Sequence, residues 1–149
     1  MIVKDIMNTS VKSATLDSPI KEIASVMCFN KISGMPVIDS NNKLVGVLSE
    51  KDILRNMFPG FDEVIEEGGS PDFEAHEADY KSLLEKKARD IMTQAVASVS
   101  PEMPLLKAAS IMCVKQIRRI PVTIDDKLVG IISIGDVHKA IFQESLINA

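Results

Sequence analysis

Apolar residues recur along the chain with two different periods, and each period predicts a different kind of element. The first helical stripe has apolar positions at the spacing i, i+3, i+4, i+7 and i+8, which lie on one helix face: Ile20, Ile23, Ala24, Met27 and Cys28. Ser18 and Pro19 precede the stripe, and this pair predicts an N-cap followed by proline at the first helical position. The pattern therefore predicts a helix that begins at Pro19.

Two short apolar runs follow this helix. They cover residues 35–38 and 44–48, and the polar stretch 39–42 between them is typical of a turn, so a β-hairpin is expected. A further helix is expected over residues 50–57, and a short strand over residues 10–13 before the first helix. The predicted order of elements is β-α-β-β-α.

The whole pattern occurs twice, so the chain contains an internal repeat. Residues 3–7 (Val-Lys-Asp-Ile-Met) return as residues 88–92 (Ala-Arg-Asp-Ile-Met). The helical stripe and the hairpin return in the same order, with Asp125 and Asp126 as predicted turn residues of the second hairpin, and the closing helix returns over residues 134–142. We therefore divide the chain into a first motif at 1–58, an insert at 59–87 and a second motif at 88–149.

The insert has no counterpart elsewhere in the chain. It predicts one helix over residues 72–87 with four candidate apolar contacts: Phe73, Tyr80, Leu83 and Leu84. It carries nine acidic and three basic side chains, so its net charge is −6 while the rest of the chain carries +2. A solvated linker and a partner-docking or lid element both fit this composition.

The composition fits a small protein with an aliphatic core. The chain has 149 residues, of which 46% are hydrophobic and 4% aromatic, and its net charge is −4. A chain of this length buries about two-thirds of its surface on folding, which is enough for a core without disulfides. The scarcity of aromatic rings and the lack of a long basic run disfavour nucleic-acid binding.

Several residue types exclude other classes of protein. No apolar run is long enough for a signal peptide or a membrane span, so we expect a cytoplasmic protein with no membrane contact. Cys28 and Cys113 occupy the same apolar helix face in each motif, and both are expected to be small buried hydrophobes. His76 and His138 show no metal-ligand spacing and no nucleophile–base pairing, so neither a metal site nor a catalytic residue is expected.

The order of these motifs resembles the cystathionine β-synthase (CBS) domain family. The residues that carry the resemblance are Asp-Ile-Met near the start of each motif, the Pro-Val strands at Pro36 and Pro121, and Gly-x-x-Ser-x-x-Asp at residues 46–52 and 130–136. The resemblance covers nearly the whole chain apart from the insert, and a tandem pair of this kind is called a Bateman module. It implies a mixed α/β (α+β) fold of two tandem β-α-β-β-α motifs packed with pseudo-twofold symmetry, plus the helical insert.

The resemblance also implies a function. In such modules, clefts between the motifs bind adenine-containing ligands, namely AMP, ADP, ATP, S-adenosylmethionine or NAD, and the family role is sensing rather than catalysis. Two modules usually form a homodimer, and larger relatives attach the pair to an enzyme, channel or transporter. Because the chain ends soon after the second motif, we expect a stand-alone module that acts on a separate effector protein.

The repeated Ser-x-x-Asp predicts a nucleotide site by its position. Ser49 and Ser133 stand where a strand ends and a helix begins, so free backbone N–H groups and the helix dipole there suit a phosphate. Asp52 and Asp136, three residues further on, can accept the two hydroxyls of a ribose, as acidic residues do in dinucleotide folds. The same pattern also fits a capping box that only stabilises the helix.

Four cations near these motifs are candidate phosphate ligands. In modules that the chain resembles, an arginine at the position of Arg118 reaches the ligand phosphate, and Arg119 would add a second guanidinium. Lys139 and Arg55 each lie one helical turn beyond an aspartate of the motif. The first motif has no arginine at the equivalent position, which disfavours phosphate binding there. Solvated surface or carboxylate pairing is the alternative role for these cations.

An adenine base needs an apolar slot with few polar contacts. The candidates are the stretch before the first helix of each motif and the residue pair at each proline: Ser10, Val11, Lys12, Met35 and Pro36 in the first motif, and Ala95, Val96, Ala97, Ile120 and Pro121 in the second. Backbone N–H and C=O groups there would contact the base edge, and the two prolines suit edge strands because they lack an N–H. A purely structural role in the core is the alternative.

We therefore predict a regulatory module that binds adenosine nucleotides between its two motifs and signals to a partner by a change of conformation. No cofactor is required. The alternative is a ligand-free dimerisation or scaffold module that docks a partner protein. A small enzyme is the weakest hypothesis, because the sequence shows no nucleophile–base pair, metal cluster or glycine-rich phosphate loop.

Overall fold

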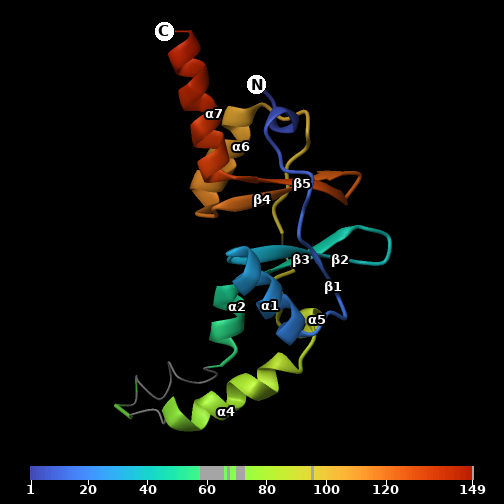
Figure 1. Ribbon diagram of the computed structural model, residues 1–149, viewed down its shortest axis with the longest axis vertical. Coiled ribbons are helices and arrows are strands. Elements are labelled where there is room, and N and C mark those ends of the chain that lie inside the picture. The colour runs from blue at the N-terminus through green and yellow to red at the C-terminus, as the bar shows by residue number, and fades with distance from the viewer. Residues whose placement is uncertain (58–65, 67, 70–72, 95, 149) are drawn as a thin grey trace. The chain divides into compact units, whose positions relative to one another are not determined.

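The computed structural model describes residues 1–57, 66, 68, 69, 73–94 and 96–148, with only the backbone of 73–78. The predicted mixed α+β class is confirmed, and the elements follow one another as Figure 1 shows: η1 (Val3–Asp5), β1 (Ala14–Thr15), α1 (Ile20–Asn30), β2 (Gly34–Ile38), β3 (Leu44–Ser49), α2 (Glu50–Arg55), α4 (Phe73–Leu84), α5 (Ala88–Ile91), α6 (Leu105–Lys115), β4 (Arg119–Ile124), β5 (Lys127–Ser133) and α7 (Ile134–Ile147). No helix in these ranges is both long and apolar enough to cross a membrane.

The chain forms two compact units, and each takes its leading segment from the other motif. The α1–α2 unit consists of Ser13–Ser40 and Val45–Ala95, whereas the α6–α7 unit consists of Met1–Lys12, Asn41–Leu44 and Val96–Ala149. The start of the first motif therefore belongs with the second motif, and the start of the second belongs with the first. The boundaries of the two sequence repeats therefore differ from the boundaries of the two compact units.

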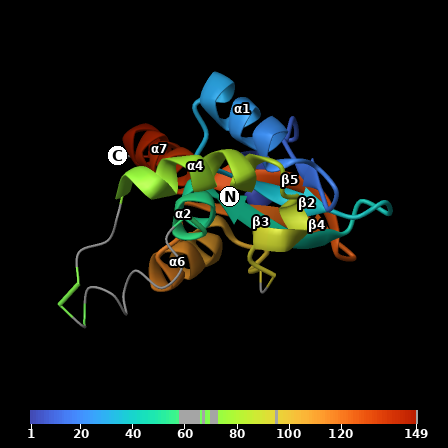
Figure 2. The same ribbon diagram turned by 90° about the horizontal axis from the view of Figure 1, so that it is seen from below.

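The α1–α2 unit has a three-stranded sheet and an aliphatic core. Its strand order is β1-β2-β3, with β1 parallel to β2 and Ala14 opposite Val37. The predicted hairpin is confirmed, since β2 and β3 are consecutive and adjacent. Buried side chains from α1 and the sheet, including Ile20, Met27 and Leu48, form one cluster. α4 lies beside α1 within this unit (Figure 2).

The α6–α7 unit is built on the antiparallel pair β4-β5, with α6 and α7 packed beside each other (Figure 1). The hairpin turns at Asp125 and Asp126, which both have positive φ, as a type I′ turn requires. These aspartates therefore form the turn that the sequence predicts. Val3 of the leading segment is fully buried in the same core as Met112 and Ile132.

Backbone hydrogen bonds attach each leading segment to the other motif. In the α6–α7 unit, the Val3 N–H donates to the Met103 carbonyl at 2.9 Å. In the α1–α2 unit, the Ala88 N–H donates to the Ser18 carbonyl at 2.9 Å. Val3 and Ala88 occupy equivalent repeat positions and are both fully buried, so the two attachments are structurally alike.

The aspartate of each Asp-Ile-Met closes the first turn of a short helix. Asp5 accepts a hydrogen bond from the Ile2 N–H, and Asp90 accepts one from the Lys87 N–H, both at 2.9 Å. A carboxylate here satisfies one of the N–H groups that the start of a helix leaves without a partner. The aspartate of the repeat is thus explained by local folding.

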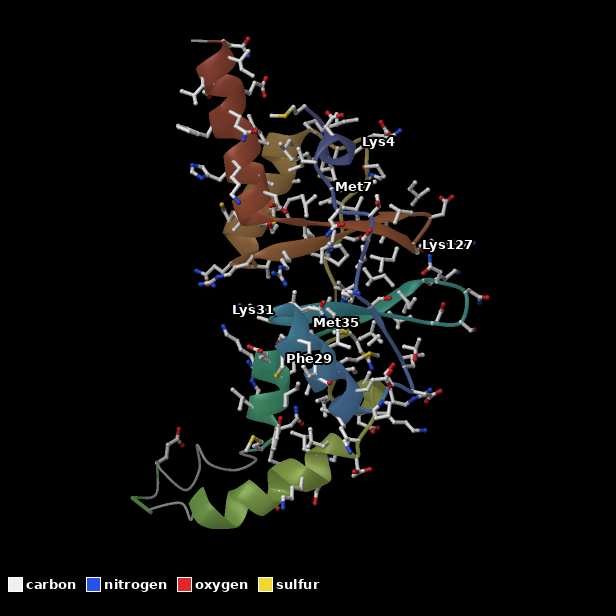
Figure 3. The ribbon with its side chains drawn as sticks, viewed as in Figure 1. Lys4, Met7, Phe29, Lys31, Met35 and Lys127 are labelled. Carbon is white, nitrogen blue, oxygen red and sulfur yellow. The ribbon has the colours of Figure 1, made fainter. Side chains whose placement is uncertain are left out.

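The methionine of Asp-Ile-Met and the glycine of Gly-x-x-Ser-x-x-Asp form one contact. A Cβ added at Gly46 would lie 2.7 Å from the Met92 sulfur and 3.0 Å from the Thr93 carbonyl oxygen. A Cβ added at Gly130 would lie 2.9 Å from the sulfur of Met7, which Figure 3 labels on the leading segment. A side chain at either glycine would force the methionine or the backbone of the leading segment to shift, so glycine suits this close crossing.

Some predicted element ends are wrong. The strand before α1 is β1 at Ala14–Thr15, whereas residues 10–13 form no strand. Pro19 is the N-cap of α1 rather than its first helical residue. Pro36 lies on the central strand β2 and not on an edge strand. The strand tolerates it because β1 is only two residues long and pairs with the two residues that follow Pro36.

The helix lengths and the cysteines also differ from the prediction. α2 ends at Arg55, two residues before the predicted end, and α7 continues to Ile147, five residues beyond it. Cys28 and Cys113 are exposed, so the prediction that they are buried is wrong. The buried residues of α1 and α6 centre on the first, fourth and eighth helix positions. Cys28 and Cys113 are the ninth residues of their helices. At about 100° per residue, the ninth position lies at the margin of the buried stripe, which explains why both cysteines are exposed.

The insert packs on the α1–α2 unit through α4. This helix covers Phe73–Leu84, less than the predicted range of 72–87. Leu83 is buried, and Tyr80 and Leu84 pack partly buried against the same core, as predicted. The side chain of Phe73 lies outside the described residues. The C-terminal half of the insert therefore contributes to a core and is more than a solvated linker.

The contact between Gly130 and Met7 predicts the effect of adding one methyl group. Gly130→Ala is expected to lower the free energy of unfolding by about 1–3 kcal/mol, because it overpacks the crossing of β5 and the leading segment. Gly135→Ala is the matched control, since its Cβ would meet only the Ser133 hydroxyl at 3.9 Å inside α7. The control is expected to raise the free energy of unfolding by about 0.5–1 kcal/mol. Urea denaturation measures both, and equal effects would contradict the contact.

Candidate functional site

The candidate site of the second motif lies where β5 continues into α7. Ser133 ends the strand, and its extended backbone (φ −110°, ψ 154°) makes it the N-cap of α7. Its hydroxyl oxygen accepts a hydrogen bond from the Asp136 N–H at 3.1 Å. Because α7 has 14 residues, its first turn carries the positive end of a full helix dipole. This end of the helix suits an anion.

Asp136 stands in the first turn of α7 with its side chain exposed. Within the described part of the chain, its carboxylate has no hydrogen-bond or ion-pair partner, and only its backbone N–H is engaged. Both carboxylate oxygens are therefore available to accept hydrogen bonds from a ligand. Lys139, one turn further along the helix, is exposed as well.

Pairing of β4 with β5 brings the two arginines to this helix start. Arg119 is directly opposite Ser133 in the antiparallel ladder. The Arg118 carbonyl accepts a hydrogen bond from the N–H of Ile134, the first residue of α7, at 2.8 Å. Both arginine side chains are exposed, and neither is in an ion pair with any described residue. Backbone pairing thus brings two exposed arginines from another part of the sequence to the start of α7.

The corresponding carboxylate of the first motif, that of Asp52, is buried and hydrogen-bonded. Asp52 is buried, with 8% of its surface exposed. Its Oδ2 accepts hydrogen bonds from the Ser49 N–H at 2.9 Å and the Ser49 hydroxyl at 3.0 Å, which completes a capping box at α2. Its Oδ1 accepts a hydrogen bond from the Thr93 hydroxyl at 3.2 Å. In this motif the Ser-x-x-Asp pattern therefore caps the helix.

The first motif lacks the two arginines that lie near the start of α7. The positions of the two arginines are held by Ser33 and Gly34, and the first residue of α2 is the acidic Glu50. α2 has only 6 residues, so its dipole is weaker than that of α7. Arg55 is exposed and is the one predicted cation of this motif. The two motifs thus share backbone geometry and differ in charge.

The candidate adenine residues fall into two groups. Met35, Pro36, Ile120 and Pro121 are buried in the cores of their own units. In the second group, Ser10 and Lys12 are exposed, and three residues are partly buried: Val11, Val96 and Ala97. Ala95 lies outside the described residues. Contact of these residues with an adenine base therefore stays a prediction. A base can reach only side chains with exposed surface, and among the apolar candidates Val11, Val96 and Ala97 have it.

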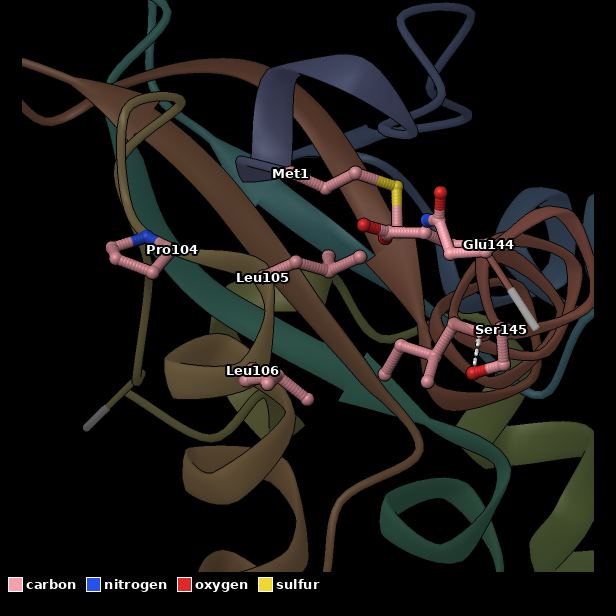
Figure 4. A pocket seen from close by; sticks show the side chains of 8 residues that line it. Met1, Pro104, Leu105, Leu106, Glu144 and Ser145 are labelled. Carbon is pink, nitrogen blue, oxygen red and sulfur yellow. Dashed lines mark hydrogen bonds between the residues drawn. The ribbon is translucent and has the colours of Figure 1, made fainter.

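Two hollows within single units involve none of the predicted nucleotide residues. One, of about 390 Å³, lies in the α6–α7 unit beside Met1, Leu105 and Glu144 (Figure 4). The other, of about 380 Å³, lies in the α1–α2 unit and is lined partly by Cys28 and Tyr80. Neither contains a cluster of charged donors for a phosphate, so we assign no nucleotide to them.

Comparison with known proteins identifies the family. The family model of the CBS domain matches the chain twice, at residues 3–58 and 88–143. An uncharacterized protein of Methanocaldococcus jannaschii, MJ1426, is 32% identical over 95% of this chain and 91% of its own. The chain therefore belongs to the CBS domain family and contains a tandem CBS pair.

Solved structures show the same fold. The CBS domain of a CBS domain-containing membrane protein from Sphaerobacter thermophilus is 31% identical, with a TM-score of 0.71 over 93% of this chain and 86% of that one. CBSX2 from Arabidopsis thaliana, in its complex with AMP, is 27% identical, with a TM-score of 0.73 over 97% of this chain and 98% of that one. The fold predicted from the repeat is thus confirmed.

One residue of the site was not found from the sequence. Thr93 directly follows the second Asp-Ile-Met, where the first copy has Asn8. Its hydroxyl contacts a carboxylate 41 residues earlier in the chain, and no local pattern indicates that pairing. The sequence signal that could have indicated Thr93 is that the two copies of the repeat differ at this position, with a hydroxyl side chain at Thr93 and an amide side chain at Asn8.

Asp52 is buried and hydrogen-bonded whereas Asp136 is exposed, so replacing each aspartate is expected to lower the free energy of unfolding by a different amount. Asp52→Ala is expected to lower the free energy of unfolding by about 2 kcal/mol, because Ser49 and Thr93 lose a buried charged acceptor. Asp136→Ala is expected to cost less than about 1 kcal/mol, since it loses only a favourable charge in the first turn of α7. Urea denaturation of both variants measures the difference. A larger cost for Asp136→Ala would contradict the assignment of the cap.

Proposed function

We propose that this protein is a regulatory module that binds an adenosine nucleotide at the start of α7 in the second motif. The observation that carries the proposal is the exposed carboxylate of Asp136, which has no partner among the described residues, at a helix N-terminus to which β4 brings two exposed arginines. Resemblance to CBSX2, whose structure is a complex with AMP, supports the choice of ligand class. AMP, ADP or ATP is the proposed ligand, with S-adenosylmethionine and NAD as further adenine-containing candidates.

Each group at the site has a defined task in this proposal. Asp136 accepts hydrogen bonds from the two ribose hydroxyls, since an ionised carboxylate only accepts and has two oxygens. The N–H groups at the start of α7 and the Ser133 hydroxyl donate to a phosphate. Arg118 and Arg119 supply planar, charged donors that suit phosphate oxygens, and Lys139 adds a point charge. Val96 and Ala97 would contact the base.

Signalling requires a surface for another protein. Phe29 and Val114 occupy equivalent positions on α1 and α6 and are 85% and 83% exposed. Leu106 and Leu146 add exposed apolar side chains on α6 and α7. Exposed apolar side chains of this size support docking of a second copy or of an effector protein. We therefore include a homodimer and a cytoplasmic effector partner in the proposed function.

Calorimetric titration with AMP, ADP, ATP, S-adenosylmethionine and NAD tests the proposal. For the nucleotide that binds, Asp136→Ala is expected to raise the Kd by about tenfold or more, because charge-assisted hydrogen bonds to the ribose are lost. Asp52→Ala is the matched control and is expected to change the Kd much less, since that carboxylate caps α2. Equal losses would contradict the asymmetry between motifs. Failure of all five compounds to bind more tightly than about 1 mM would contradict the function.

Discrimination at the ribose gives a second test. A 2′-deoxyribonucleotide offers Asp136 one hydroxyl instead of two, so the protein is expected to bind it about tenfold more weakly than the ribonucleotide. Asp136→Ala is expected to abolish this preference while leaving the contacts of Arg118 with phosphate. Competition between the two nucleotides, followed by calorimetry, measures the ratio. A preference that survives Asp136→Ala would place the ribose elsewhere.

A further inference from the structure

The Asp52 carboxylate uses both of its oxygens inside the protein. Three donors from two different residues approach it: the N–H and the hydroxyl of Ser49 and the hydroxyl of Thr93. Ser49 belongs to the capping box and holds only Oδ2. Thr93 is the one donor to Oδ1 among the described residues, and it comes from the leading segment of the other motif. Without it, one carboxylate oxygen would stay available.

The backbone holds Thr93 rigidly in place for this contact. The Thr93 N–H donates to the Val47 carbonyl at 2.9 Å, and the Val47 N–H donates to the Thr93 carbonyl at 2.9 Å. Such a two-way pair fixes the strand-like crossing, and the close approach to Gly46 fixes it further. The hydroxyl of Thr93 is therefore positioned by the crossing itself.

The second site has the same crossing with a different side chain. The Asn8 N–H and carbonyl make the same two-way pair with Ile131, at 2.9 and 3.0 Å. The Asn8 side-chain oxygen, however, accepts a hydrogen bond from the Ser10 N–H at 2.9 Å, and among the described residues the Asn8 side chain makes no hydrogen bond with the start of α7. Asp136 stays exposed beside it. At this position, threonine accompanies the engaged carboxylate of Asp52, and asparagine accompanies the exposed carboxylate of Asp136.

We infer that Thr93 holds the Asp52 carboxylate in the helix cap and so removes it from ligand binding, which leaves Asp136 as the one ribose-accepting carboxylate of each chain. Thr93 acts as a positioning residue, through the aspartate and without touching a ligand. The exchanged leading segment thereby decides which of two sites with the same backbone is open. The role of Asp136 in ribose binding rests on the proposed function, whereas the hydrogen bond by which Thr93 holds Asp52 does not depend on it.

Carboxylate labelling tests the state of Asp52 without any ligand. The folded protein is treated with a water-soluble carbodiimide and glycine ethyl ester, and the rate of labelling at each carboxylate is followed by peptide mass spectrometry. In the unaltered protein, Asp136 is expected to react about tenfold faster than Asp52, because the hydrogen-bonded carboxylate is protected. Thr93→Val, which removes the hydroxyl and keeps the shape, is expected to raise the Asp52 rate by about tenfold.

Three variants separate the hydroxyl of Thr93 from general loosening. Thr93→Ser keeps a hydroxyl and is expected to restore the slow rate at Asp52. Thr123→Val is the matched control, since it removes a threonine hydroxyl that donates to the Ser98 hydroxyl in the other unit, and it is expected to leave the labelling rate of Asp52 unchanged. A fast rate at Asp52 in the unaltered protein, or an unchanged rate in Thr93→Val, would overturn the inference. An equally fast rate in Thr93→Ser would overturn it as well.

The reciprocal change tests the consequence for the ligand. Asn8→Thr places the hydroxyl beside the second helix start and is expected to slow labelling of Asp136 and to weaken AMP binding by about tenfold. Unchanged labelling at Asp136 would overturn the inference that this position controls the carboxylate. If AMP fails to bind the unaltered protein while labelling follows the expected pattern, the proposed function fails and the role of Thr93 stands.

Discussion

The contact on which the rest of the structure depends is the crossing of each leading segment over a glycine of the other motif. Met92 and Thr93 lie against Gly46, and Met7 and Asn8 lie against Gly130, so closely that an added Cβ would require the leading segment to shift. Beside this crossing, Val3 and Ala88 are buried in their units, so each unit contains residues from both copies of the repeat. Two of the repeated motifs, Asp-Ile-Met and Gly-x-x-Ser-x-x-Asp, are thus the two sides of a single packing arrangement.

The same backbone serves two purposes in the two motifs. At α2, Ser49 and Asp52 satisfy each other and Thr93 takes the remaining oxygen, so the motif stabilises a short helix. At α7, the serine caps a long helix while the carboxylate stays available next to exposed arginines. A buried carboxylate needs hydrogen-bond donors to offset the cost of its desolvation, whereas an exposed carboxylate without such donors can accept hydrogen bonds from a ligand. The same motif therefore caps the helix with its carboxylate in one copy and leaves the carboxylate exposed in the other.

The insert and the cysteines show where pattern and packing diverge. The composition of the insert fits a solvated linker, yet Tyr80 and Leu83 pack on the core of the α1–α2 unit. Cys28 and Cys113 follow the helical stripe in sequence, yet both are exposed, because the buried face is narrower than the stripe. Periodicity indicates which face of a helix is apolar, but the width that becomes buried depends on the elements packed against it.

The sequence by itself determined the repeat, the order of helices and strands, the hairpin turn at Asp125 and the family. These features are local, since they follow from short-range periodicity, turn residues and motif spacing. It also placed Ser133, Asp136 and Arg118 in one candidate site. Only the tertiary structure decided which leading segment joins which core, and hence that Thr93 engages Asp52 while Asn8 leaves Asp136 available. That choice depends on contacts between residues far apart in the chain, which no local pattern encodes.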